Sequence, residues 1–373
     1  MRSHADAKPM DYGYLVLVGA LVTFGLLMLA SASASVGYDR FGDSYYFVKH
    51  QVVFGLIPGI AGLVFFSRTS YAFWKKHAWN LLIASLALLV LVFIPGLSAG
   101  IGTAHSWISI GGWFTVQPSE FVKLFFLFYL SGWLDTRGEH GVKDVGSGFL
   151  PFVLVLLAII GLLALQPDVG TMSIVVIMSL VTYFLAGAPM AYVLALVSAG
   201  MAGIALLIGL APYRLQRFMT FLNPELDPQG VGYHINQALL AIGSGGFFGL
   251  GYGHSRQKFQ YLPEVAGDSI FAIIAEEMGF VVACLLVAAF VAFLWRTLAI
   301  ANGAPDRFGR LVAAGVGTWI TVQALANIAS MAGLMPMTGI PLPFVSYGGT
   351  SLAVSLSAVG VVLNISKYRR GNS

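Results

Sequence analysis

Ten long apolar stretches recur along the chain, and they limit its fold more than any other feature. A helix that crosses a bilayer needs about 20 largely apolar residues, and backbone groups inside the bilayer must be hydrogen-bonded within the protein. Of the 373 residues, 58% are hydrophobic and only 10% are charged. We therefore predict an all-α integral membrane protein with about ten transmembrane helices. The stretches are residues 13–35, 46–66, 79–96, 118–135, 149–166, 169–186, 189–210, 269–295, 309–332 and 342–366.

Basic residues gather in alternate connections between these stretches. If the N-terminus is cytoplasmic, the inner segments hold thirteen of the 20 Lys and Arg residues: Arg2, Lys8, Arg68, Lys75, Lys76, Arg137, Lys143, Arg296, Arg307, Arg310, Lys367, Arg369 and Arg370. Loops rich in Lys and Arg stay on the cytoplasmic side. We expect a multi-pass protein of the bacterial cytoplasmic membrane with both termini in the cytoplasm. The net charge of +4 comes mostly from these flanks, so it does not indicate nucleic-acid binding.

One connection, from about residue 211 to 268, is much longer than the others. It contains Pro212, Pro224 and a glycine cluster at 243–253, and long connections of this kind are usually functional or disordered. Apolar residues recur among its polar ones, so we expect short helices lying along the membrane surface. No internal repeat is visible. We interpret residues 1–373 as a single polytopic domain whose long extracytoplasmic loop joins helices 7 and 8.

Polar side chains concentrate on the predicted outer side of the membrane. Such groups in or beside apolar helices are costly unless paired, and they are often functional. The inner half of the helices offers chiefly Glu276 and Glu277. We therefore expect a site that opens outward and accepts a large, anionic ligand. The outer set is Gln117, Glu120, Lys123, Gln166, Asp168, Arg214, Arg217, Gln237, Lys258, Glu264, Asp268, Thr338, Ser346 and Tyr347.

The acidic groups also have purely structural interpretations. Glu120 and Lys123 stand three residues apart in a predicted helix that Pro118 begins, so they can pair for stability alone. Asp268 comes directly before an apolar stretch, where an aspartate commonly caps the helix. Position alone leaves these alternatives open.

The cations and the remaining motifs also have simple explanations. Arg214, Arg217 and Lys258 can reach lipid headgroups without any further role. The glycine cluster lacks the spacing of phosphate-binding loops, and the seven histidines lack the spacing of a zinc site. We assign no metal ligands. Cys284, the only cysteine, cannot form an intrachain disulfide and is expected to be buried.

Several strings are similar to the signature segments of one family, in the same order. They are residues 117–120 followed by Lys123, then 166–171, 213–217, 257–258, 261–264 with Asp268, 273–279 and 338–351. On these residues the chain resembles the shape, elongation, division and sporulation family, of FtsW and RodA type, from Asp11 to Arg370. The segment 267–271 and the pair at 257–258 are more similar to FtsW than to RodA.

The resemblance implies a ten-helix peptidoglycan glycosyltransferase. Such an enzyme joins lipid II units into glycan strands at the outer face of the cytoplasmic membrane, for cell division or elongation. The resemblance also implies an inverting transfer, help from a divalent cation (Mg²⁺ or Mn²⁺), a lipid-linked glycan strand as the second substrate, and a class B penicillin-binding transpeptidase as a partner.

Asp268 is implied as the catalytic base, which would take the proton from the 4-hydroxyl of the acceptor sugar. A helix dipole at its position would favour the ionised carboxylate. Cations would stabilise the departing diphosphate, and for these we expect Lys123, Arg214, Arg217 and Lys258. The full set of expected substrate-binding residues is Lys258, Glu264, Lys123, Glu120, Arg214, Arg217, Gln237 and Ser346.

Two positions depart from the family pattern, and two other functions stay open. His105 precedes Ser106 and Trp107 where the family commonly has an arginine before the tryptophan, and His234 replaces a usual glutamine, although Gln237 is retained. A lipid II transporter would need polar groups through the full membrane depth. A non-catalytic division scaffold would tolerate asparagine in place of Asp268.

Overall fold

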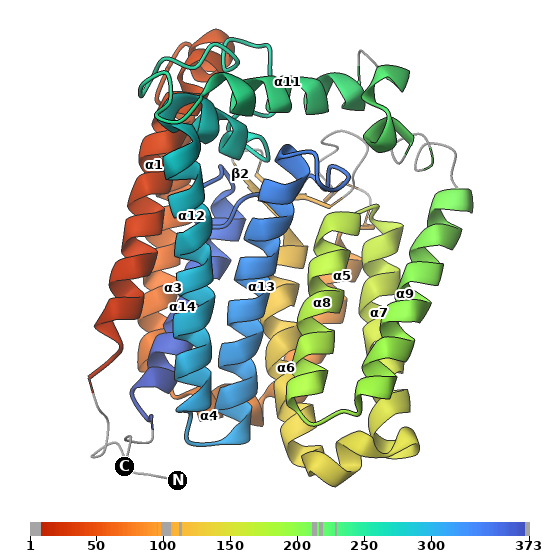
Figure 1. Ribbon diagram of the computed structural model, residues 1–373. Helices are drawn as coiled ribbons and strands as arrows, with labels where there is room; N and C mark the ends of the chain where they lie inside the picture. Colours follow the sequence, from red (N-terminus) through yellow and green to blue (C-terminus); the bar gives the residue numbers. More distant parts are fainter. Residues whose placement is uncertain are drawn as a thin grey trace.

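The protein is described by a computed structural model that covers residues 9–94, 96–97, 106–111, 114–210, 215, 219–227 and 230–369. Long helices stand side by side in one bundle (Figure 1). The start of the first long helix lies beside the end of the last one. Asp11 N donates to Ser366 Oγ at 3.1 Å, and Arg369 pairs with Asp11 at 3.1 Å. Both described ends of the chain therefore lie at the same end of the bundle.

Each of the ten predicted stretches contains a helix. The bounds are α1 (Tyr12–Phe41), α2 (Tyr46–Gln51) continued by η2 (Val52–Leu56) and α3 (Ile57–Arg68), α5 (Ala78–Leu91), α6 (Pro118–Lys143), η3 (Val145–Phe149) with α7 (Leu150–Leu165), α8 (Val169–Leu185), α9 (Met190–Leu210), α12 (Ile270–Asn302), α13 (Arg307–Met331) and α14 (Gly349–Ser366). The short elements are α4 (Tyr71–Lys76), η4 (Pro224–Leu226) and α11 (Val231–Ser244).

Length and composition confirm a multi-pass membrane protein. Six helical segments among the described residues are long and apolar enough to cross a membrane, and three more apolar helices are shorter. Large apolar side chains cover the outside of the bundle, such as Leu165 at 70% and Trp295 at 69% exposure. Cys284 is also exposed, on α12, so the prediction that it is buried is wrong. A lipid-facing wall explains both observations, since a bilayer solvates apolar groups.

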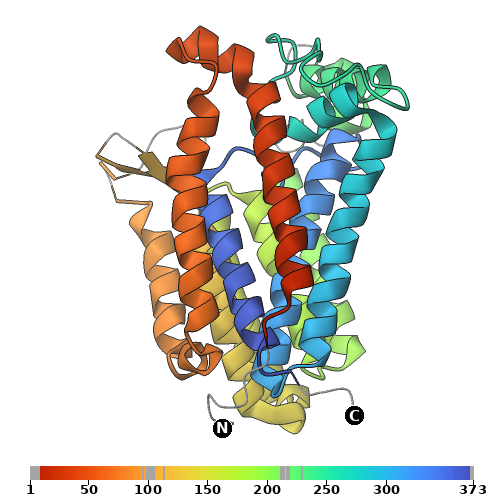
Figure 2. The same cartoon turned by 90° about the vertical axis from the view of Figure 1, so that its left-hand side faces the viewer.

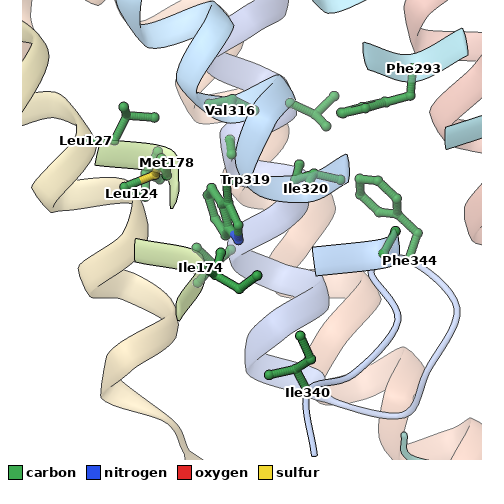
Figure 3. Packing of buried hydrophobic residues seen from close by; sticks show 14 of the residues in the cluster. Leu124, Leu127, Ile174, Met178, Phe293, Val316, Trp319, Ile320, Ile340 and Phe344 are labelled. Atoms are coloured by element: carbon green, nitrogen blue, oxygen red, sulfur yellow. The ribbon is translucent and has the colours of Figure 1, made fainter. Parts of the chain in front are cut away.

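The core lies along α13, between α6, α8 and α12. Trp319 is 1% exposed, and Figure 3 shows it among Leu124 of α6 and Ile174 of α8. Close approach requires small residues here: a Cβ on Gly315 would lie 2.3 Å from Leu127 Cδ1. Packing of this kind, through small residues, is how helices associate within a bilayer.

Two segments differ from the predicted all-helical pattern. A short antiparallel hairpin, β1 (Ile108–Ile110) and β2 (Phe114–Val116), precedes α6 and lies at the same end of the bundle as α11 (Figure 2). Residues 342–348, predicted as the start of the last helix, are not helical. Pro341 and Pro343 lack the N–H that a helix interior needs, and α14 begins only at Gly349.

The helix α12 is broken near its start at Gly279, which has φ 78° and ψ 179°. The loop 245–251 inserts its backbone into the break: Leu250 N donates to Glu276 O at 3.0 Å, and Phe280 N donates to Gly246 O at 2.9 Å. The freed backbone groups are thus satisfied, as membrane-embedded segments require. A Cβ on Gly279 would lie 2.3 Å from Gly249 N, so only glycine fits.

This break corrects the predicted depth of two glutamates. Glu276 and Glu277 were placed in the inner half of the helices, but both stand in the first two turns of α12, before Gly279, and contact residues 253–258 of the long loop. Within that loop, α11 lies across the end of the bundle that is remote from the two described chain ends (Figure 1).

Candidate active site

Asp268 ends the long loop and directly precedes α12. The N-cap residue of α12 is Ser269, and its side chain makes no capping hydrogen bond. Elsewhere in this chain Asp11, Asp168 and Asp306 do cap their helices, each accepting from the N–H three residues later. Asp268 is therefore not the cap residue of its helix, so the simplest structural explanation for it does not hold. Its side chain is half-buried.

The backbone on either side of Asp268 is fixed by two neighbouring segments. Asn327 of α13 donates through Nδ2 to the carbonyl of Asp268 at 2.8 Å and to that of Ile340 at 2.9 Å. Ser346 donates through Oγ to the carbonyl of Gly267 at 2.7 Å, and Tyr347 N donates to Ala266 O at 2.8 Å. The turn is therefore held at three consecutive carbonyls.

The segment that holds this turn is in turn fixed by α2. Gln51 Nε2 donates to Ser346 O at 3.2 Å, and Gly348 N donates to Gln51 Oε1 at 2.9 Å. Tyr347 Oη contacts His50 Nδ1 at 2.9 Å. Such a continuous polar network rigidifies the groups it connects, so α2, α13 and the segment before α14 together determine where Asp268 lies.

The environment of Asp268 makes its carboxyl group a stronger base than an exposed aspartate. Burial, reinforced by the negative charge of Glu264, raises the pKa of Asp268 to about 6. Glu264 is itself exposed, and its backbone carbonyl accepts from the N–H of Gly267 at 2.9 Å and of Ser269 at 3.3 Å. The helix dipole was expected to favour the ionised carboxylate, but burial and Glu264 outweigh the groups that favour ionisation, and the net shift in pKa is upward. At neutral pH the carboxylate is still mostly ionised.

A histidine that the sequence interpretation did not place in the site contacts this turn. His234 of α11 lies with Nε2 at 2.6 Å from Ser269 Oγ, and Ser269 Oγ lies 3.5 Å from Asp268 Oδ1. The only sequence signal was the replacement of the usual glutamine by His234. Gln237 follows on α11 three residues later, so it shares that side of the helix, and it is half-buried.

Lys258 is buried in an ion pair instead of reaching toward headgroups. Its Nζ lies 2.8 Å from Glu277 Oε1 and also donates to Gly253 O at 2.7 Å and Ser31 Oγ at 3.1 Å. The residue is only 4% exposed. The neighbouring Glu276 accepts from Arg256 N at 2.9 Å. Both glutamates thus anchor residues 253–258 to the start of α12.

The predicted pairing of Glu120 with Lys123 is confirmed. Lys123 Nζ lies 2.8 Å from Glu120 Oε1, 2.8 Å from Gln323 Oε1, and 4.8 Å from the centre of the Trp319 ring. Both charged residues are 1% exposed. Glu120 Oε2 is buried and has no hydrogen-bond partner among the described residues. The pair joins the first turn of α6 to α13 in the interior of the bundle.

Two further signature segments meet at the starts of α6 and α8. Gln117 Nε2 and Ser119 Oγ each lie 3.3 Å from Asp168 Oδ2. Asp168 also caps α8 through the N–H of Thr171 at 3.0 Å. The segments 117–120 and 166–171 therefore share one contact, which explains why both carry polar residues at these positions.

The structure thus unites part of the predicted site. Ser346 directly supports the Asp268 turn and Glu264 belongs to it, whereas Lys258 and the Glu120–Lys123 pair contact other polar partners. Arg214, Arg217 and His105 lie outside the described residues. Among those that are described, no group of three or more His, Cys, Asp or Glu side chains could hold a metal ion. These residues do not fit a metal site built from protein ligands alone.

Comparisons with known proteins cover nearly the whole chain. The family described as Cell cycle protein, comprising FtsW, RodA and SpoVE, matches residues 12–371. The chain is 42% identical over 360 residues to the stage V sporulation protein E of Bacillus subtilis, with 96% of this chain and 98% of that protein covered. It is 40% identical to a probable peptidoglycan glycosyltransferase FtsW of Trichlorobacter lovleyi, with 95% and 93% covered.

Solved structures give the same relationship. A chain from a peptidoglycan synthase complex that coordinates polymerization and crosslinking superposes with a TM-score of 0.79 at 29% identity, covering 96% of this chain and 98% of that one. The rod shape determining protein RodA of Thermus thermophilus superposes with a TM-score of 0.71 at 28% identity, covering 97% and 98%.

Proposed function

This chain belongs to the FtsW, RodA and SpoVE family of cell cycle proteins, and from that premise we propose that it is a peptidoglycan glycosyltransferase. It polymerises lipid II into glycan strands at the outer face of the cytoplasmic membrane, in division or elongation. Relatives named peptidoglycan glycosyltransferase FtsW, similar over almost their full length, support this activity. Several relatives named FtsW, at 36–40% identity, support an FtsW-like role, alongside the sporulation protein at 42%.

The observation that carries the chemical proposal is the state of Asp268. It is a half-buried carboxylate that does not cap α12, with a backbone fixed by Asn327 and Ser346. An inverting transfer from a lipid diphosphate to a sugar hydroxyl needs one general base at the acceptor. Asp268 accepts the proton of the acceptor's 4-hydroxyl as that oxygen attacks the donor's anomeric carbon. The bond from this carbon to the diphosphate breaks, and the configuration inverts.

The departing diphosphate needs positive charge around it. Arg214 and Arg217 are the proposed cations, on their sequence position alone. Lys123 and Lys258 already bind carboxylates at 2.8 Å. Each lysine charge is therefore largely balanced by its glutamate, so these two residues contribute less positive charge toward the diphosphate than an unpaired cation would. Gln237, Glu264 and Glu120 are also proposed to bind the substrate. Glu264 is exposed, so it would contact the substrate at the surface of the protein.

A divalent cation, Mg²⁺ or Mn²⁺, remains part of the proposal through the substrate. Diphosphate oxygens are typical ligands for such ions and supply what the described side chains do not, because these form no cluster of three metal-binding groups. Bound there, the cation would offset the charge of the leaving group. Every other step above is carried by residues of this chain.

The membrane topology and the partner are also proposals. Both termini face the cytoplasm, because the described chain ends share one end of the bundle with basic residues such as Arg296 and Arg369. The start of α12, which directly follows Asp268, lies at the opposite end (Figure 1), and we propose that this end is extracytoplasmic. A class B penicillin-binding transpeptidase is the proposed partner, supported by the likeness to a chain of a synthase complex that couples polymerization to crosslinking.

Purified protein in lipid vesicles, supplied with lipid II, tests the activity. Glycan strands longer than a disaccharide, resolved on a gel, are the expected product. Movement of lipid II between leaflets without strand synthesis would instead make the chain a transporter. If the protein neither makes strands nor moves lipid II, with or without the transpeptidase partner, the result would favour a division scaffold.

A further inference from the structure

We propose that His234 is a positioning residue for the catalytic base, which it holds through Ser269 and thereby links α11 to the active site. This inference rests on the proposed role of Asp268. It assigns a function to a residue that departs from the family pattern and to a helix whose position on the bundle otherwise has no chemical explanation.

The contacts form a continuous chain of three side chains. His234 Nε2 lies 2.6 Å from Ser269 Oγ, which is a short hydrogen bond, and Ser269 Oγ donates to Asp268 Oδ1 across a longer 3.5 Å. His234 lies in α11, whereas Asp268 and Ser269 directly precede α12, and His234 and Ser269 are 35 positions apart in sequence. Ser269 is fully buried and His234 is half-buried, so solvent does not easily replace either partner.

The number of protons shared by these three side chains determines the tautomer of His234. The Ser269 hydroxyl has a single proton, and Asp268 is its acceptor. The contact between His234 and Ser269 can then be a hydrogen bond only when Nε2 carries the proton and donates it. Burial lowers the pKa of His234 to about 4, so its imidazole is neutral and has one N–H. His234 thus fixes the direction of the Ser269 hydroxyl toward Asp268.

A hydrogen bond to a carboxylate both orients it and stabilises its charged form. Asn327 and Ser346 do neither for the carboxylate oxygens, because they bind backbone carbonyls of the turn. The backbone N–H groups of Asp268 and Ser269 favour the ionised form together with the Ser269 hydroxyl. Glu264 is the charged neighbour that faces Asp268, and it disfavours ionisation. The His234–Ser269 pair therefore opposes Glu264 in setting the basicity of Asp268.

A plain structural role predicts a different outcome. A half-buried histidine can simply fill space between α11 and the start of α12. In that case any substitution of similar size would serve, and the ionisation of Asp268 would not respond. The hydrogen-bond role predicts that glutamine, whose side-chain amide reaches about as far as Nε2, replaces histidine, whereas the shorter asparagine does not.

The test measures pH-rate profiles of lipid II polymerisation for wild type, His234→Ala, His234→Asn, His234→Gln and Ser269→Ala. We expect kcat to fall roughly tenfold in the alanine and asparagine variants, as for a lost hydrogen bond to a charged group, with KM little changed. Their acidic limb should move to higher pH by about half a unit. His234→Gln should recover most of the lost rate. The double variant His234→Ala with Ser269→Ala should resemble either single variant, since both act through one contact.

Controls separate this inference from the parent proposal. Asn236→Ala, on the exposed side of α11, should leave rate and pH profile unchanged, and binding of lipid II should confirm that each variant is folded. An active Asp268→Asn protein would refute the proposed function itself. An inactive Asp268→Asn protein together with an unmoved acidic limb in His234→Ala and Ser269→Ala would overturn only the role of His234. A limb that moves to lower pH would overturn it too, because His234 would then be accepting the Ser269 proton.

Discussion

Lys258 and Glu277 form a buried ion pair, with 2.8 Å between Nζ and Oε1, that ties the loop before the catalytic turn to the start of α12. Removing one member of such a pair leaves an uncompensated buried charge, which typically destabilises a protein by about 3–5 kcal/mol. We predict that Lys258→Met lowers the thermal unfolding temperature strongly. The double variant with Glu277→Gln should recover part of that loss.

The exposed pair Lys49–Asp43 provides the matched control, because its lysine is 68% exposed. Lys49→Met should cost less than about 1 kcal/mol. If Lys258→Met keeps its stability and instead loses affinity for lipid II, then Lys258 acts mainly on the ligand.

Glu120 and Lys123 lead to a second prediction. The Lys123 ammonium is held by Glu120, Gln323 and the Trp319 ring. Lys123→Met leaves the carboxylate unpaired and should destabilise the bundle by a few kcal/mol. Lys123→Met with Glu120→Gln should restore folding, as seen in unfolding temperature. If the refolded double variant still fails to bind lipid II, the pair contributes to substrate binding as well.

The pKa of Asp268 gives a third prediction, on pH. A general base works only when deprotonated, and the pKa of Asp268 is raised to about 6. The rate should therefore be constant above neutral pH and fall about tenfold per unit below pH 6. Removing the negative charge of Glu264 by Glu264→Gln should move this limb to lower pH, because a like charge no longer opposes ionisation. A limb near pH 4 in the wild type would contradict the assignment.

The break in α12 gives a fourth prediction, about stability. Gly279 has φ 78° and approaches Gly249 N too closely for any side chain. Gly279→Ala forces a side chain into a backbone conformation that essentially only glycine adopts, at a cost of about 1–3 kcal/mol, and it expels the inserted loop, so the unfolding temperature should drop sharply. Gly243→Ala, in α11 with open space at its Cβ, should be neutral or slightly stabilising. Similar behaviour of the two variants would mean that the inserted loop is not rigid.

The sequence predicted the helices well and their ends less well. Apolar stretches near 20 residues long have few options in a bilayer, so each of the ten contains a helix. Hydropathy could not distinguish the loop 342–348 from a helix, because Phe344 and Val345 are as buried as helix residues, at 3% and 1% exposure. The depth of Glu277 was wrong because the pairing of loop 245–251 with α12 is a tertiary contact that hydropathy does not encode.

Apart from the Glu120–Lys123 pair, the long-range contacts of the candidate site could not be predicted from the sequence, and neither could the contact of His234 with Ser269. The family signature segments identified Asp268 and Ser346 as candidate site residues. In the structure, Ser346 Oγ donates to the carbonyl of Gly267, the residue before Asp268. The pairing of Lys258 with Glu277 spans 19 residues, and that of His234 with Ser269 spans 35. Neither pair has a short sequence spacing that would predict it, because both contacts depend on how the long loop folds onto α12.

The most direct test replaces one oxygen of the proposed base. Asp268→Asn keeps the size of the side chain and removes its basicity, so purified Asp268→Asn protein should bind lipid II with near-parental affinity and make no glycan strands. Asp168→Ala, which removes the cap of α8, should instead lower stability by about 0.5–2 kcal/mol. Strand synthesis by folded Asp268→Asn protein at the parental rate would contradict the account.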